Sequence, residues 1–187
     1  MKRLLIIPLV VTGLCISGCE KSDETDIFGE DTLFDDGEAD ATEAVAHLQP
    51  MEGSSVTGTI TFTSGMGDGL EIEGDLTGLD EGKHGFHVHG GSSCTQPGDH
   101  FNPDGAQHSA PDSTSRHLGD LGNVDAGSDS TASVNMTVDR IRLDSLNSIV
   151  GHALIVHENE DDLTTQPSGN SGPAVACGVI KLPEGDM

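Results

Sequence analysis

Val56-Thr57-Gly58-Thr59-Ile60-Thr61-Phe62 places threonine at every second position, between glycine and apolar residues. A side-chain period of two is typical of a β-strand with one face in the core. The alternation recurs over 70–76 and 132–138, and the nearly continuous apolar run Ile149–Val156 predicts a strand inside the core. Because turn sequences such as Gly67-Asp68-Gly69 separate these runs, the chain from about residue 43 is predicted to be all-β.

The composition agrees with this fold class, and the net charge limits the kinds of molecule that the protein could bind. The 187 residues include 25 Gly and five Phe, with neither Trp nor Tyr. This suits many short strands joined by turns better than a helical bundle. The formal net charge is −24, and a polyanion of this size repels nucleic acid and anionic lipid headgroups. Neither is expected as a partner.

The first residues have the pattern of an export signal. A positive start, Met1-Lys2-Arg3, precedes an apolar stretch over 4–16 that is too short to span a bilayer comfortably. Ile16-Ser17-Gly18-Cys19 resembles the lipobox of bacterial lipoproteins, which predicts a signal peptide over 1–18 and a lipid on Cys19. The alternative is an ordinary secretory signal with an incidental cysteine. Both predict export, and the first predicts a cell-envelope or periplasmic protein anchored to a bacterial membrane through Cys19.

Residues 19–42 are acidic and poor in apolar side chains, which predicts a disordered tether ahead of a domain over 43–187. Removal of 1–18 would take away two basic residues and lower the formal charge to −26. It would leave Cys19, Cys94 and Cys177. If Cys19 carries the lipid, the other two form the only intramolecular pair available, which favours a Cys94–Cys177 disulfide.

Seven of the nine histidines gather near segments rich in Gly, Asp and Ser. They are His84, His87, His89, His100, His108, His117 and His157. Neutral imidazole is the commonest metal ligand in proteins, so the set indicates a metal centre. The candidate ligands lie in or beside two long segments, about 90–120 and 158–174, and loops of this length are usually functional.

The spacing suggests two ligand sets. His100, His108, His117 and Asp120 are separated by 8, 9 and 3 residues, and three imidazoles with one carboxylate suit zinc and leave no open position. The all-nitrogen set His87, His89, His100 and His157 suits copper better than a hard cation.

Over nearly all of 43–181 the chain resembles the copper/zinc superoxide dismutases. The matching stretches, in the family's order, are Gly85-Phe86-His87-Val88-His89, His100-Phe101-Asn102-Pro103, His117-Leu118-Gly119-Asp120-Leu121-Gly122-Asn123-Val124, Val156-His157-Glu158 and Ala176-Cys177-Gly178-Val179-Ile180. The resemblance implies a flattened eight-stranded Greek-key β-barrel, or sandwich, with two long functional loops.

The resemblance also implies the roles of the ligands. One copper ion would bind His87, His89, His100 and His157, and one zinc ion would bind His100, His108, His117 and Asp120. The His100 ring would bridge the two metals and exchange one of them for a proton during superoxide dismutation, which makes it the catalytic residue. A homodimer is left open.

Other residues take supporting roles by the same resemblance. Asp161 would link His87 to His108, His84 would brace the fold, and Cys94 and Cys177 would form the family disulfide. His47 and His152 match no ligand and are expected on strand surfaces.

One position departs from the family. Most members carry an arginine three residues before the second disulfide cysteine, where it attracts the superoxide anion, but this chain has Ala174, and no Lys or Arg occurs from 157 to 177. The chain is therefore expected to be a slow enzyme unless a cation such as Lys83 or Arg116 guides the substrate. The main alternative is a low-turnover copper- or zinc-binding module. A degenerate adhesion lipoprotein would not need every ligand, and a zinc hydrolase would need an open zinc position.

Overall fold

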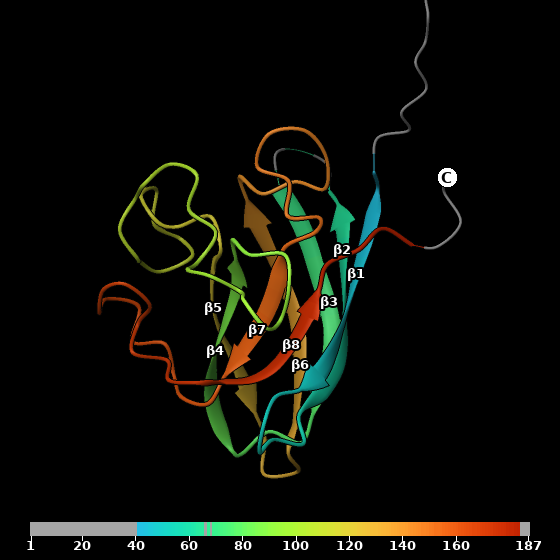
Figure 1. Cartoon of the computed structure of the whole chain (residues 1–187), viewed down its shortest axis with the longest axis vertical. Coiled ribbons are helices and arrows are strands. Elements are labelled where there is room, and N and C mark those ends of the chain that lie inside the picture. The colour runs from blue at the N-terminus through green and yellow to red at the C-terminus, as the bar shows by residue number, and fades with distance from the viewer. Residues whose placement is uncertain (1–40, 66, 68, 184–187) are drawn as a thin grey trace, which may run out of the picture. The chain divides into compact units, whose positions relative to one another are not determined.

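Eight β-strands and no helix are found in the part of the chain that the structure describes, so the all-β prediction is confirmed. The computed structural model describes residues 41–65, 67 and 69–183. The strands are β1 (Glu43–Pro50), β2 (Thr57–Ser64), β3 (Gly69–Thr77), β4 (Gly82–His89), β5 (Asp120–Ala126), β6 (Thr131–Asp139), β7 (Ala153–His157) and β8 (Ala174–Val179) (Figure 1).

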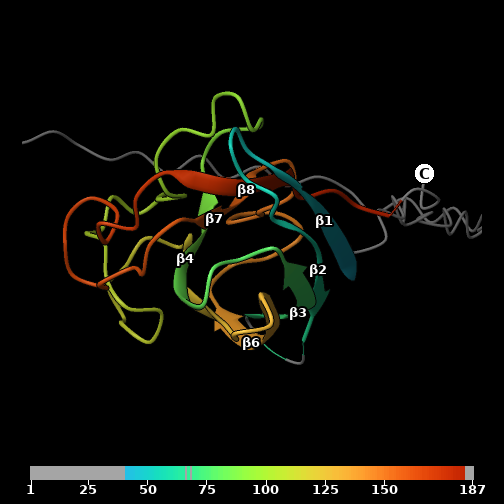
Figure 2. The ribbon, with the colours of Figure 1, turned by 90° about the horizontal axis from the view of Figure 1, so that it is seen from below.

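The strands form one antiparallel sheet that curls into a nearly closed barrel. Its order is β5-β4-β7-β8-β1-β2-β3-β6. The two end strands, β5 and β6, are joined by a tight turn in which the Gly127 amide donates to the Thr131 carbonyl at 2.9 Å. The view along the barrel shows the strands arranged around a common axis (Figure 2). The connections from β3 to β4 and from β6 to β7 join strands that are not neighbours, so the predicted Greek-key barrel is confirmed.

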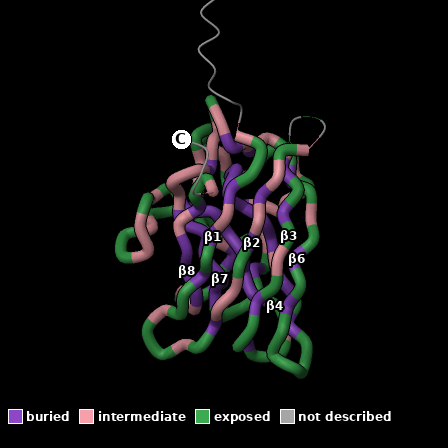
Figure 3. The backbone as a smooth tube through the Cα atoms, turned by 90° about the vertical axis from the view of Figure 1, so that its right-hand side faces the viewer, coloured by how far each residue is buried: buried purple, intermediate pink, exposed green. Residues whose placement is uncertain are grey.

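Alternating side chains fill the barrel. In β3, Leu70, Ile72 and Leu76 are buried, whereas Glu71 and Glu73 point to solvent. Figure 3 shows this change between buried and exposed positions along β1 to β3. Strands of this kind gain their stability from burying one face, at roughly 1.5–3 kcal/mol for each large apolar side chain.

One predicted strand is shorter than expected. The run Ile149–Val156 becomes strand only from Ala153 onward. Gly151 has φ +85°, and the His152 amide donates to the Ile149 carbonyl at 3.1 Å, so the first half of the run forms a turn. Ile149 is still fully buried, which explains why an apolar run did not distinguish turn from strand.

Strand β4 presents different side chains on its two faces. Phe86 and Val88 belong to the hydrophobic core, and strand geometry places His87 and His89 on the opposite face. The segment before β5 runs beside β4, because the Val88 amide donates to the Gly119 carbonyl at 3.0 Å. A Cβ at Gly119 would lie 2.0 Å from the Val88 carbonyl oxygen, so this close approach requires glycine.

Two long loops follow the strands that carry histidines. Residues 90–119 connect β4 to β5, and 158–173 connect β7 to β8, as the sequence predicted. None of the residues that the structure describes lie in a helix long and apolar enough to cross a membrane. The predicted signal peptide over 1–18, Cys19 and almost all of the predicted tether lie outside the described residues.

Candidate metal centre

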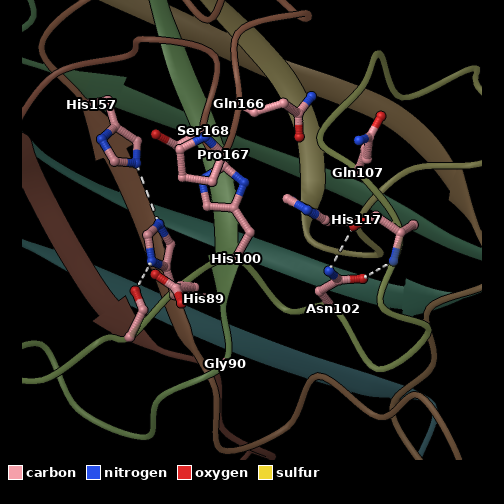
Figure 4. A pocket seen from close by; sticks show the side chains of 13 residues that line it. His89, Gly90, His100, Asn102, Gln107, His117, His157, Gln166, Pro167 and Ser168 are labelled. Carbon is pink, nitrogen blue, oxygen red and sulfur yellow. Dashed lines mark hydrogen bonds between the residues drawn. The ribbon is translucent and has the colours of Figure 1, made fainter.

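Four histidines converge where β4, β7 and the 90–119 loop meet, and we refer to them as the four-histidine group. They are His87, His89, His100 and His157. One ring nitrogen of each lies within 4.8 Å of the others, and all four side chains are buried. His100, in the 90–119 loop, forms a single antiparallel β-bridge with His89 of β4. Figure 4 shows His89 and His157 facing each other across the cavity, with their Nε2 atoms 3.4 Å apart.

Hydrogen bonds on the outer nitrogens orient three of these rings. His87 Nε2 donates to Asp161 Oδ2 at 2.7 Å. His89 Nδ1 donates to the Gly98 carbonyl at 2.7 Å, and His157 Nδ1 donates to the Gly172 carbonyl at 2.9 Å. Each bond fixes the tautomer, so the lone pair of the other nitrogen points toward the centre of the group.

Two of the inward nitrogens are unsatisfied. His87 Nδ1 and His100 Nε2 are buried and have no hydrogen-bond partner among the described residues. A buried polar atom without a partner costs about 1–3 kcal/mol, and a bound metal ion would supply the missing interaction. Burial also lowers the pKa of His87 to about 3 and of His89 to about 4, which keeps both rings neutral and able to bind a metal.

A second group shares His100 and contains a carboxylate; we call it the His/Asp group. Its members are His100, His108, His117 and Asp120. Asp120 Oδ1 lies 2.7 Å from His100 Nδ1, 3.0 Å from His108 Nδ1 and 3.2 Å from His117 Nδ1. Three nitrogens and one oxygen at this spacing form the donor set of a tetrahedral zinc site.

The contact of His108 with Asp120 fits a metal better than a hydrogen bond. Although the two atoms are 3.0 Å apart, His108 Nδ1 is without a hydrogen bond of acceptable geometry to any described residue. Burial by itself would lower the pKa of His108, but the Asp120 and Asp161 carboxylates outweigh it and raise the pKa to about 9, so a metal ion that binds Nδ1 must displace a proton from this ring. The histidine and backbone contacts of Asp120 in turn hold the pKa of that carboxyl well below its usual range, despite burial.

Asp161 connects the two groups. Its Oδ2 accepts from His87 Nε2 at 2.7 Å, and its Oδ1 accepts from His108 Nε2 at 2.9 Å, which is the arrangement that the resemblance implies. The side chain of Asn123 holds the Asp161 backbone: Nδ2 donates to the Asp161 carbonyl at 2.9 Å, and Oδ1 accepts from the Asp161 amide at 2.8 Å. A Cβ at Gly169 would lie 1.6 Å from Asp161 Oδ1, so glycine is needed to cover this carboxylate closely.

Several residues that support the two groups were not predicted from the sequence. The carbonyls of Gly98 and Gly172 orient copper-type ligands, and Asn123 holds Asp161. The only available signal was for Asn123, which lies in the matching stretch that begins at His117. Nothing in the sequence singled out the two glycines.

The remaining histidines lie away from the two groups. His84 is buried, with Nδ1 2.9 Å from the His157 carbonyl and Nε2 2.9 Å from the Asp80 carbonyl, so it ties β4 to the end of β7 and to the connection before β4. His47 is exposed on β1, as expected. The expectation for His152 was wrong: it lies in the turn before β7, with its ring centroid 4.7 Å from that of Phe101.

A cavity of about 700 Å³ opens over both groups (Figure 4). His89, His100, His117 and His157 line it. The described residues that line the cavity include Asp99 but no Lys or Arg. Ala174 pairs with His157 in the β7–β8 ladder, so the position at which the family carries its arginine is next to the four-histidine group.

Neither cation suggested by the sequence lines this cavity. Arg116 is fully buried and donates to the carbonyl and carboxylate of Asp139. Lys83 pairs with Glu160 at 3.1 Å on the surface.

The predicted disulfide is present between Cys94 and Cys177, which are 83 residues apart. It attaches the 90–119 loop to β8, four residues before the Gly98 carbonyl that orients His89.

Comparison with known proteins agrees with the fold. The sequence model of the copper/zinc superoxide dismutases matches residues 56–180. The crystal structure of the clock protein EA4 is similar, with a TM-score of 0.74 and 35% sequence identity, and the match covers 79% of this chain and 98% of that chain. The two residue groups could hold metal ions and fit copper and zinc binding. The chain belongs to the copper/zinc superoxide dismutase family.

Proposed function

We propose that this protein is a superoxide dismutase that uses copper in the four-histidine group and zinc in the His/Asp group. The observation that carries the proposal is the position of His100 in both groups. Its Nε2 is buried and unsatisfied among the described residues, and its Nδ1 lies 2.7 Å from Asp120 Oδ1. A ring held from the Nδ1 side can exchange a metal for a proton at Nε2 without moving away.

Bound copper would supply reversible one-electron transfer, and bound zinc would fix the shared ring and tune its basicity. One superoxide loses an electron and leaves as dioxygen. A second takes up that electron and two protons and leaves as hydrogen peroxide. His100 Nε2 is the atom from which one of these protons would come, and water in the cavity would supply the other. His87, His89 and His157 keep their orientation throughout, because their outer nitrogens are hydrogen-bonded.

The charges around the cavity support a slow enzyme. The substrate is an anion, whereas the described lining contains Asp99 and no cationic side chain, and Ala174 takes the place of the family's arginine. Electrostatic guidance changes association rates by about 10–10³-fold, so its loss lowers the rate without removing the chemistry.

The decisive experiment loads the full chain with copper and zinc and measures superoxide dismutation beside His157→Ala. We expect activity in the wild type and a loss of more than about a hundredfold in the variant, beyond the 10–100-fold typical of residues that only support a ligand. Zinc content should be unchanged, because His157 is outside the His/Asp group. A wild-type chain that binds both metals without turnover would instead establish a low-turnover metal-binding module, which the cation-free cavity lining favours.

We propose further that the protein is exported, anchored by lipid on Cys19, and protects the cell envelope. The sequence pattern around Cys19 supports this. Incorporation of a labelled fatty acid by the wild type and not by Cys19→Ser would agree with it, whereas release of an unlabelled mature chain would indicate an ordinary secretory signal.

A further inference from the structure

The side chain of Gln166 binds the backbone of a candidate zinc ligand. Its Oε1 accepts from the His108 amide at 2.8 Å, and its Nε2 donates to the His108 carbonyl at 2.8 Å. The same Nε2 donates to the Thr164 carbonyl at 3.1 Å. One side-chain amide therefore makes the pair of bonds that a neighbouring strand would make with His108.

His108 needs this support because no strand supplies it. It lies in the middle of the 90–119 loop, outside the named strands. Its ring is held at Nε2 by Asp161 at 2.9 Å, and its backbone is held by Gln166. Asp161 and Gln166 both belong to the 158–173 loop, so one loop fixes the position and the rotation of a ligand carried by the other.

The same segment forms part of the cavity wall. Gln166, Pro167 and Ser168 line the cavity together with His117 (Figure 4). Gln166 therefore contacts His108 and also contributes to the wall of the cavity.

We propose that Gln166 is a positioning residue that holds His108 in place for zinc. The proposal rests on zinc binding in the His/Asp group. The bond pattern requires an amide, since one side-chain atom must accept from an N–H while the other donates to two carbonyls.

The test compares Gln166→Ala, Gln166→Glu and the control Gln107→Ala in the full chain. Gln107 also lines the cavity and precedes His108, so its removal controls for the loss of an amide there. Zinc release to a chelator and the visible spectrum of cobalt(II) in the His/Asp group are measured, with the copper spectrum as an internal reference.

We expect Gln166→Ala to release zinc about 10–100-fold faster, the range for residues that orient a ligand, with an altered cobalt spectrum and unchanged copper ligation. Glu should not rescue it, because its second oxygen would face the carbonyls of His108 and Thr164. Gln107→Ala should release zinc at the wild-type rate.

Three outcomes would overturn the proposal. Zinc release and a cobalt spectrum like those of the wild type in Gln166→Ala would remove the positioning role, and full rescue by Glu would show that only side-chain shape matters. If the wild type itself binds no zinc, the proposal falls together with the zinc part of the proposed function, whereas the first two outcomes leave that function intact.

Discussion

The two residue groups share His100 but differ in what holds them. In the four-histidine group, His87 and His89 lie on β4 and His157 ends β7, so the barrel sets their positions. In the His/Asp group, His108 and His117 lie in the 90–119 loop and are held by side chains of Asp120, Asp161 and Gln166. The four-histidine group is therefore largely built by the fold, whereas the His/Asp group is built by contacts that a single substitution can remove.

Metal removal should give the largest contrast between the groups. Zinc present at about 100 times its dissociation constant stabilises the bound state by about 2.7 kcal/mol. Stripping the metals should therefore speed amide exchange at His108 and Ser109 about a hundredfold, because their amides bond to Gln166 and Asp120. The amides of Leu154 and Ile155 in β7, a strand paired on both sides with β4 and β8, should change little. Equal acceleration at all four amides would show that the barrel does not build its site independently of metal.

The contrast explains how much could be predicted from the sequence. Alternation over 56–62, 70–76 and 132–138 predicted strands because a half-buried sheet imposes period two on its own residues. The start of β7 was missed because the buried turn at Ile149 is as apolar as the strand that follows. The candidate metal ligands themselves were predicted from the spacing of the histidines and from the resemblance to the family.

The supporting contacts could not be predicted, for a physical reason. The Gly98 and Gly172 carbonyls bind rings 9 and 15 residues away, and Gln166 binds a backbone 58 residues away. These partners are chosen by the path of two loops without regular structure. A backbone carbonyl carries no side-chain identity, so the sequence does not reveal which one will face a ring.

Removing the charge of Asp161 should give the second-largest difference between the two groups. Asp161→Asn keeps the shape of the side chain but replaces one acceptor oxygen with a donor, between two ring N–H groups. We expect zinc affinity to fall about 10–100-fold and copper affinity to fall less, because His89 and His157 keep the hydrogen bonds that orient their rings. Chelator competition for each metal measures both changes. Asp162→Asn is the control, since Asp162 bonds Thr164 and Thr165 instead; a copper loss as large as the zinc loss in Asp161→Asn would contradict the comparison.

A change of charge near the cavity should have a smaller effect, on the rate of dismutation at the four-histidine group only. In the wild type, dismutation should rise with ionic strength, because salt screens a net repulsion. Ala174→Arg should raise the low-salt rate about tenfold and reverse the slope, so that the rate falls with salt. Ala174→Gln controls for side-chain size. A wild-type rate that falls steeply with salt would mean that a cation elsewhere already guides the anion.

The smallest expected effect concerns the outer end of the 90–119 loop. Arg140, just after β6, donates to the Thr114 carbonyl at 3.1 Å and pairs with Asp104, on either side of His108. The pair is partly exposed, and such pairs contribute about 0–1 kcal/mol. Arg140→Ala should therefore speed zinc release by up to about fivefold and leave copper release unchanged. Lys181→Ala, which removes the same charge beside β1, is the control. If both variants speed zinc release equally, net charge rather than loop attachment is responsible, and the His/Asp group then depends on the loop only through its inner contacts.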